Sequence, residues 1–457
     1  MHLFFATHPA TSVAYSSWTP SRAVMGLMTI VLSICLLYGS AMAEERKVMR
    51  SSDVIRMIGV TTHMGYTDGA YARVNNVIQD LKFLGVSYIR DMLPGSDSGP
   101  GLVGRDALRR MIYEQIKLNI VFPSGWNAAS ISWLRTLEAA VPGAVASIEG
   151  YNEINNFPVK YEGRNGPDAA KNGQRALYAT VKSDPVLGHV PVFDMTGFEL
   201  IQDPAFSYAT TLDGFADVMN IHAYSQNGAQ PRYWIDPTRP DAYKNLGAEL
   251  PKVITEFGYS SRPESGWGFI GVDEITQAKG ILNGLFDAAR SGYDKLYIYE
   301  LLDEKPDSDM KELEFHFGLF TFDNAPKPAA KAIRNLTTIL ADTSDLGREA
   351  TNAPSSDTSI RLHVDVPNPK IPIYSLVLTK GNGARLLALW REPTFWDRAN
   401  GHAVEEQPVQ LDVSFGRSCG SIRLYDALLS GSPISTSSGD SVSVALGDHL
   451  QLVECTS

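Results

Sequence analysis

Short apolar runs alternate with longer amphipathic or turn-rich stretches between residue 54 and about residue 340. This alternation predicts repeated βα units that build a parallel sheet. Eight of the runs qualify as strands, and eight parallel strands close a (β/α)8 barrel. The predicted strands are residues 54–61, 86–90, 119–123, 146–151, 190–194, 218–222, 252–255 and 295–299.

Helical spacing appears in the stretches between these strands. Apolar residues recur every three to four positions in residues 70–84, 106–117 and 275–291, as on one face of a helix. Residues 327–340 would form the closing helix. The sequence therefore predicts an α/β fold in which residues 44–345 form a TIM barrel of ordinary size.

The pattern changes after residue 341. Ser, Thr, Asp, Asn and Pro dominate as far as residue 359, which is typical of a connecting loop. Beyond it, apolar and polar residues alternate in several short runs, and Asn382-Gly383 suits a hairpin turn. We therefore predict a small C-terminal β-sandwich at residues 346–457. It could bind carbohydrate, but packing against the barrel is the simpler interpretation.

Composition narrows the class of protein. The 457 residues are 44% hydrophobic and carry a formal net charge of −11 without a basic tract, so neither a disordered chain nor a nucleic-acid partner is expected. At the N-terminus, Arg22, the apolar residues 23–38 and Ala41-Met42-Ala43 resemble a secretory signal. We expect residues 1–43 to be a signal peptide, the only membrane contact of a secreted or periplasmic protein. The alternative is a retained membrane anchor.

Cysteine and acidic residues add little further chemistry. Cys35 falls in the predicted signal, whereas Cys419 and Cys455 could either pair in an oxidising compartment or be buried separately. No spacing resembles a zinc or redox motif. The acidic loop at residues 303–309 lacks the ordered ligands of a calcium loop and is better explained as solvated. We expect no metal, no cofactor and a monomer.

Two predicted strands end in a glutamate. Glu153 follows the apolar run 146–151, and Glu256 follows residues 252–255. The active site of a barrel of this type lies at the C-terminal ends of its strands. Hydrolysis of a glycoside requires one carboxyl group as proton donor and a second, ionised one that attacks or stabilises the sugar carbon. The pair therefore predicts a glycosidase, although either glutamate alone could be an ion-pair residue.

Other polar and aromatic residues also fall at strand ends, where they could bind substrate. They are His63, Arg90, Trp126, Asn152, His222, Tyr224, Tyr299 and Glu300. A histidine or arginine in such a place can equally be a structural group. Trp126, Tyr299 and Trp267 could stack on sugar faces or pack at the barrel rim.

Four of these motifs together resemble glycoside hydrolase clan A. They are Arg90, Asn152-Glu153, His222-Ala223-Tyr224, and Glu256 in Thr255-Glu256-Phe257-Gly258. A barrel followed by a β-sandwich is most similar to family 39 and to related bacterial exopolysaccharide hydrolases.

The resemblance implies a role for each residue. Glu153 is the expected acid/base, which must begin protonated, and Glu256 the nucleophile of a retaining mechanism. Asn152 would bind the sugar 2-hydroxyl, and Arg90 would keep Glu256 ionised. Tyr224 would donate a hydrogen bond to Glu256, and His222 would line the same wall.

One departure from the clan pattern concerns the last strand. Clan members frequently have a tryptophan there, whereas this chain has Tyr299-Glu300. By resemblance to some family 39 members, Glu300 would contact a sugar hydroxyl.

The function predicted is an exported retaining glycosidase that cleaves β-linked polysaccharide, such as an extracellular-matrix or cell-wall glycan. A non-catalytic glycan-binding protein and an envelope assembly factor on the same scaffold are the alternatives. Within the enzyme class, an inverting mechanism would require carboxyl groups about 6.5–9.5 Å apart instead of about 5–5.5 Å.

Overall fold

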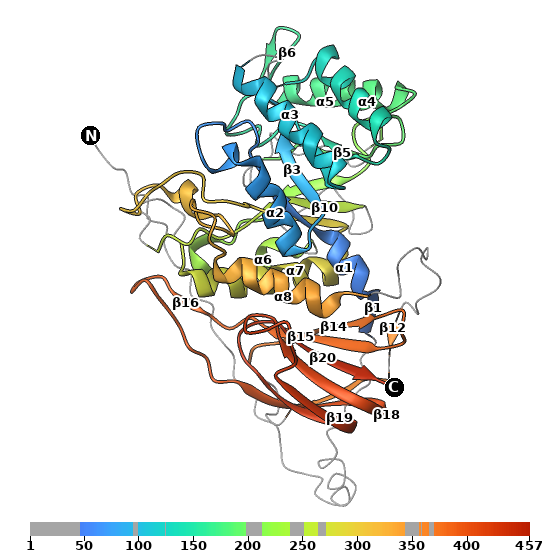
Figure 1. Ribbon diagram of the computed structural model, residues 1–457, viewed down its shortest axis with the longest axis vertical. Helices are drawn as coiled ribbons and strands as arrows, with labels where there is room; N and C mark the ends of the chain where they lie inside the picture. Colours follow the sequence, from blue (N-terminus) through green and yellow to red (C-terminus); the bar gives the residue numbers. More distant parts are fainter. Residues whose placement is uncertain are drawn as a thin grey trace, which may run out of the picture. The chain divides into compact units, whose positions relative to one another are not determined.

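The computed structural model describes residues 46–94, 99–123, 125–197, 213–237, 251–263, 271–342, 356–357, 359–364 and 370–457 (Figure 1). The predicted signal peptide at residues 1–43 and the predicted aromatic residue Trp267 lie outside these ranges. Among the described residues, no helix combines the length and the apolar character needed to cross a bilayer.

Eight parallel strands form a closed barrel, as the sequence predicts. Each strand pairs with its neighbours in chain order, β11 pairs with β2, and a bridge between Phe193 and Val218 completes the ring. Strands of this barrel are buried on both faces, so each one appears in the sequence as a continuous apolar run. The alternation of these runs with amphipathic stretches could therefore be recognised in the sequence. The strands are β2 (Ile58–Thr61), β3 (Tyr88–Met92), β4 (Lys117–Val121), β5 (Val145–Glu149), β8 (Val192–Phe193), β9 (Met219–His222), β10 (Lys252–Phe257) and β11 (Lys295–Ile298).

Helices cover the outside of these strands, and in Figure 1 α3 to α5 lie on one side of β3, β5 and β10 and α6 to α8 on another. Asp273 caps α7 by accepting a hydrogen bond from the Thr276 backbone N–H at 2.7 Å, as expected for a helix start. The helices are α1 (Ser51–Met57), α2 (Val74–Leu84), α3 (Gly99–Tyr113), α4 (Ala128–Ala140), α5 (Pro167–Ser183), α6 (Arg232–Ile235), α7 (Glu274–Ser291) and α8 (Pro328–Leu340). Short elements in the loops are η1 (Ala70–Ala72), β6 (Lys160–Tyr161), β7 (Arg164–Asn165), η3 (Gln226–Gly228) and η4 (Leu313–His316).

The first predicted strand is too long. Residues 54–57 belong to α1, and the strand begins only at Ile58. Val54 and Met57 are buried at a helical spacing of three residues, so they extend the apolar run without extending the strand.

The C-terminal residues form a β-sandwich, as predicted. Its sheet has the order β12-β1-β14-β15-β20-β18-β13, with β19 paired to β18. The first part of the long β18 pairs with β13 and its last part with β20, so the sheet folds over on itself around a separate apolar core. The strands are β12 (Ser356–Asp357), β13 (Arg361–Val364), β14 (Ile373–Thr379), β15 (Arg385–Arg391), β16 (Trp396–Asp397), β17 (His402–Ala403), β18 (Val409–Asp426), β19 (Ser435–Leu446) and β20 (Gln451–Thr456).

This sheet also contains β1 (Arg46–Arg50), from the start of the described chain. β1 pairs in parallel with β14, so residues 46–50 belong to the C-terminal sheet although the sequence prediction counted them with the barrel. Strand pairing over such a sequence distance leaves no local pattern, because alternation identifies a strand but not its partner.

The sandwich packs directly on the barrel. Leu386, Ala388 and Trp390 of β15 join the apolar core of the barrel, whereas Leu387 and Leu389 face the core of the sandwich. The Trp390 indole N–H donates to Asp287 of α7 at 3.0 Å. These contacts are those of a domain that packs against and stabilises the barrel.

Cys419 and Cys455 form a disulfide between β18 and β20. Of the two alternatives that the sequence leaves open, the structure therefore has the pair. The bond closes a segment with a sequence separation of 36 residues, for which chain entropy predicts a stabilisation of about 4 kcal/mol.

Candidate active site

A cleft of about 670 Å³ opens where the barrel strands end. Seven of the ten residues predicted for the site line it: His63, Arg90, Asn152, Glu153, Tyr224, Glu256 and Tyr299. The strand-end rule therefore brought together residues that are up to 236 positions apart, from His63 to Tyr299.

Glu256 lies at the end of β10, between an arginine and a tyrosine. Its Oε1 accepts a hydrogen bond from Nη1 of Arg90 at 2.6 Å, and its Oε2 accepts one from the hydroxyl of Tyr224 at 2.7 Å. A cation and a hydroxyl donor both favour the ionised form of a carboxyl group. Glu256 thus has the surroundings of an oriented carboxylate.

Arg90 is itself held in place by a buried network. Its Nε and Nη2 donate to the two oxygens of Glu149, each at 2.8 Å, and Nη2 also donates to Oδ1 of Asn152 at 2.8 Å. Although burial opposes the charged form, Glu149 and Glu256 raise the pKa of Arg90. The guanidinium therefore remains a fixed positive charge next to Glu256.

Glu149 is the main residue that the sequence reasoning missed. It is fully buried on β5 and also accepts hydrogen bonds from Asn119 at 2.8 Å and Thr255 at 3.1 Å. Charged residues are almost never fully buried without a partner. The position of Glu149 at the end of the apolar run 145–148 could therefore have indicated a buried glutamate with a partner in the site.

Glu153 follows β5 in a loop, with a backbone φ of 41°. Its backbone N–H donates to the Thr196 hydroxyl at 3.1 Å, which fixes this left-handed position. Oε2 accepts a hydrogen bond from Asn156 at 3.0 Å, and Oε1 lies 2.9 Å from Nδ1 of His222.

His222 lies beside both glutamates. The same Nδ1 is 3.5 Å from Oε2 of Glu256, and the imidazole is almost completely buried, so it does not line the cleft. Burial opposes the charge of His222, but Glu256 and Glu153 raise its pKa. Burial alone would raise the pKa of Glu153, yet the hydrogen bond and charge of His222 lower it. The contact with His222 therefore favours the ionised form of Glu153 in the ligand-free site, whereas the sequence reasoning expects this group to begin protonated.

The carboxyl groups of Glu153 and Glu256 are close together. One oxygen of each, together with a ring nitrogen of His222, forms a group whose atoms all lie within 4.8 Å of one another. The two carboxyl groups also share a contact, since Nδ1 of His222 is 2.9 Å from one and 3.5 Å from the other.

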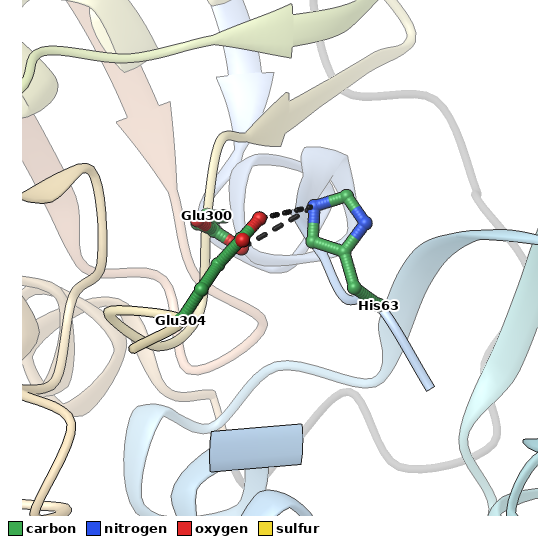
Figure 2. A group of neighbouring side chains, drawn as sticks. All are labelled: His63, Glu300 and Glu304. Carbon is green, nitrogen blue, oxygen red and sulfur yellow. Dashed lines mark ion pairs between the residues drawn. The ribbon is translucent and has the colours of Figure 1, made fainter. Parts of the chain in front are cut away.

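Another group of acidic residues surrounds His63, as Figure 2 shows. Glu300 is fully buried and accepts a hydrogen bond from Tyr71 at 2.7 Å. It does not line the cleft, whereas Glu304 does. Burial raises the pKa of Glu300 well above its ordinary value and that of Glu304 to about 7, and it lowers the pKa of His63 to about 4.

Trp126 lies away from the lining of the cleft. Its ring stacks on Tyr161 with centroids 6.4 Å apart, and its indole N–H donates to the Gly173 carbonyl at 3.2 Å. In this structure Trp126 packs in the wall beside α5, which is the other role that the sequence left open.

Two groups of side chains have the composition and closeness of metal ligands within the part of the chain that the structure describes. They are Glu153 with His222 and Glu256, and His63 with Glu300 and Glu304. Neither group is recognisable as a metal motif in the sequence, because each one combines residues that lie far apart along the chain.

Comparison with solved structures identifies proteins that share this fold. A family 39 glycoside hydrolase from the gut symbiont Bacteroides cellulosilyticus superposes with a TM-score of 0.59 and 16% identity, over 88% of this chain and 82% of that chain. A monomeric β-xylosidase from Caulobacter crescentus has a TM-score of 0.51 and 15% identity, over 90% of this chain and 98% of that one. The protein therefore has the fold of family 39 glycoside hydrolases.

Comparisons based on sequence alone find no match. No protein-family model matches the chain, and no curated protein matches it in sequence. The resemblance expected from the sequence motifs is thus confirmed for the fold.

Proposed function

We propose that this protein is an exported, retaining glycoside hydrolase that cleaves β-glycosidic bonds in a polysaccharide. The observation that carries the proposal is the closeness of the two strand-end carboxylates, with an oxygen of Glu153 within 4.8 Å of one of Glu256. The hydrogen bonds from Arg90 and Tyr224 to Glu256 support its role as nucleophile. The shared fold with family 39 enzymes supports the same class.

The first step replaces the glycosidic bond with a bond to the enzyme. A carboxylate oxygen of Glu256 attacks the anomeric carbon while the bond from that carbon to the leaving oxygen breaks. Glu153 gives its proton to this oxygen, which departs as an alcohol. In the second step Glu153 takes a proton from water, the water oxygen attacks the anomeric carbon, and Glu256 is released as carboxylate.

His222 supplies the proton for the first step. In the ligand-free site the raised pKa of His222 and the lowered pKa of Glu153 both favour an imidazolium next to a carboxylate. The proton needs to move only across the 2.9 Å hydrogen bond to Oε1 of Glu153. A sugar in the cleft excludes water from Glu153 and favours this transfer, because desolvation disfavours a carboxylate.

The proposed substrate is a β-linked polysaccharide of an extracellular matrix or cell wall. A cleft of about 670 Å³ is large enough for several sugar units.

The disulfide between Cys419 and Cys455 supports export, since such bonds persist in oxidising compartments. Fractionation of the native host, with thiol counting on the purified mature protein, tests this part. Cytoplasmic protein with two free thiols would contradict export.

The decisive experiment measures hydrolysis of β-linked polysaccharides and aryl glycosides by the mature protein beside Glu153→Gln and Glu256→Gln. We expect Glu256→Gln to lose at least about 10³-fold in kcat on every substrate, because a covalent intermediate can no longer form. Glu153→Gln should lose about 10²–10⁴-fold on polysaccharides but much less on aryl glycosides with acidic leaving groups, which need no proton. Glu312 is exposed and does not line the cleft, so Glu312→Gln is the matched control.

Added azide separates the two roles. It can attack the glycosyl-enzyme of Glu153→Gln without help from a base, so it should restore turnover and give a β-glycosyl azide. NMR shows the anomeric configuration of the product that forms first. A product with inverted configuration would contradict the retaining mechanism. Glycan binding without cleavage by any version would identify a binding protein instead.

A further inference from the structure

Three side chains converge beside the cleft, from the loops that follow β2 and β11: His63, Glu300 and Glu304 (Figure 2). Nε2 of His63 is 3.3 Å from Oε2 of Glu300 and 4.0 Å from Oε1 of Glu304. One nitrogen or oxygen from each residue lies within 4.8 Å of the other two. The reaction proposed above uses none of the three.

Several buried atoms in this cluster lack a hydrogen-bond partner in the protein. His63 is 6% exposed and Glu300 0%, yet neither ring nitrogen of His63 nor Oε1 of Glu300 has one. An unpaired buried polar atom costs about 1–3 kcal/mol, and native structures contain few of them. A bound cation at the centre of the cluster would give Nε2 of His63 and a carboxylate oxygen of Glu300 a partner.

We propose that His63, Glu300 and Glu304 bind one divalent transition-metal ion, with Zn²⁺ the best match. One imidazole and two carboxylates form a ligand set that zinc accepts, whereas calcium and magnesium prefer oxygen ligands alone and more of them. In a tetrahedral site with bonds of about 2.0–2.1 Å, ligand atoms are about 3.3–3.4 Å apart. The separations from His63, 3.3 and 4.0 Å, are close to this value.

Aromatic packing holds two of the three ligands in place. The His63 ring stacks on Tyr66 with centroids 4.7 Å apart, and the rings of Tyr71 and Tyr299 meet its edges at 5.6 Å. The Tyr71 hydroxyl donates to Oε2 of Glu300, which orients that carboxylate. Such outer contacts are what fix ligand geometry around protein-bound metals.

The backbone positions the third ligand. The Ala70 N–H donates to the Glu304 carbonyl at 3.0 Å, and a Cβ added to Gly69 would lie 2.5 Å from the same oxygen. This close approach joins the loop after β11 to the segment after β2, which carries His63. The main chain therefore already holds the loop of Glu304 beside the segment that carries His63.

The fourth coordination position would face the substrate. His63, Tyr66 and Glu304 line the cleft, whereas Glu300 lies behind its wall. A metal with three protein ligands keeps an open position for water or a ligand oxygen. We infer that a hydroxyl or carboxylate of the bound glycan occupies it, which would make the metal a specificity element. Metal binding itself does not depend on the proposed hydrolysis.

Calorimetric titration of ZnCl₂ into the chelator-treated mature protein tests the site. Because Glu153, His222 and Glu256 are also close enough to bind a metal, every protein in the series carries Glu256→Gln. We expect one Zn²⁺ per chain, and at least tenfold weaker affinity when Glu304→Gln is added. Glu312→Gln is the matched control, since Glu312 is exposed and is not one of the ligands, and should leave the affinity unchanged.

The proposal is overturned if Zn²⁺ does not bind in a saturable way, or if Glu304→Gln binds it as tightly as the parent. A change in glycan affinity in Glu304→Gln without metal binding would mean that the cluster is a wall of the sugar site only. Glu300→Gln provides a second test if its thermal unfolding shows that it folds. All these readouts are independent of turnover, so loss of the hydrolase proposal would leave them interpretable.

Discussion

Glu256 and Asp91 both lie at strand ends of the cleft, and both are more than nine-tenths buried, but their partners differ. Glu256 accepts hydrogen bonds from the cation Arg90 and from Tyr224. Asp91 accepts its hydrogen bonds from the Thr62 hydroxyl at 2.6 Å and a backbone N–H at 2.9 Å, and its Oδ1 has no partner. Burial raises the pKa of Asp91 to about 7.

The two histidines repeat this contrast. Burial lowers the pKa of His63 to about 4, whereas the pKa of His222 is raised because Glu256 and Glu153 outweigh its burial. Burial is therefore outweighed on one wall of the cleft and not on the other. Neighbouring opposite charges favour the charged forms of His222 and Glu153, and their scarcity favours the neutral forms of Asp91 and His63.

Removal of the counter-charge is the change with the largest expected effect. Arg90→Met would leave Glu149, which is fully buried, next to Glu256 without a cation. We expect a loss of about 3–5 kcal/mol in the free energy of unfolding, the usual result of breaking a buried ion pair. Hydrolysis should fall at least about 10³-fold, since Glu256 loses both charge support and orientation. Urea denaturation and aryl glycoside turnover measure the two effects.

An exposed ion pair provides the control. Arg109 and Asp106 are paired on α3, with side chains 44% and 54% exposed. Arg109→Met should change the stability by less than about 1 kcal/mol. An Arg90→Met protein as stable as the wild type would show that the buried network is not needed for the fold.

On the wall of the cleft that carries Asp91, one substitution should stabilise the protein. Asp91 titrates at about 7 in the folded protein against an ordinary value of 3.8, so its contribution to stability is present below pH 4 and is lost as the pH rises to about 7. Asp91→Asn keeps an oxygen acceptor without this loss. Between pH 4 and pH 8 its stability should therefore gain about 2–4 kcal/mol relative to the wild type, measured by urea unfolding across that range.

Asp448 supplies a control with the reverse sign. Burial would raise the pKa of its carboxyl group, but His449 and Lys279 lower it to about 2. Asp448→Asn should therefore lose stability relative to the wild type as the pH rises above about 2. If both variants changed in the same direction with pH, burial and counter-charge would not be the opposing causes inferred here.

Much of the fold was predictable because parallel strands buried on both faces leave an apolar run in the sequence. The limit of local pattern is visible at Val54 and Met57, which continue an apolar run but lie in α1. It is visible again at β1, whose partner β14 lies far along the chain. Periodicity identifies elements, whereas pairing depends on long-range packing.

The site was predictable for a different reason. The ends of barrel strands meet in space, so residues such as Arg90 and Glu256 could be grouped from their positions alone. Glu149 was missed because it lies within its strand and points to the network instead of the cleft. The protonation of Glu153 was also predicted differently, because it depends on the 2.9 Å contact with His222, which no sequence pattern contains.

The smallest expected effect comes from the second donor to Glu256. Tyr224→Phe removes the 2.7 Å hydrogen bond and leaves the contact with Arg90. A hydrogen bond to a charged group contributes about 1.5–3 kcal/mol, so kcat should fall about 10–100-fold.

Tyr66→Phe is the matched change on the other wall, where the ring stacks on His63 and lines the same cleft. It removes a hydroxyl without touching either hydrogen bond to Glu256, so kcat should fall much less than in Tyr224→Phe, whatever happens to substrate affinity. An equal loss of kcat in both tyrosine variants would mean that the cleft responds to the loss of any hydroxyl. A loss in Tyr224→Phe alone would assign the effect to the direct donors of Glu256, because Arg90 bonds one of its oxygens and Tyr224 the other.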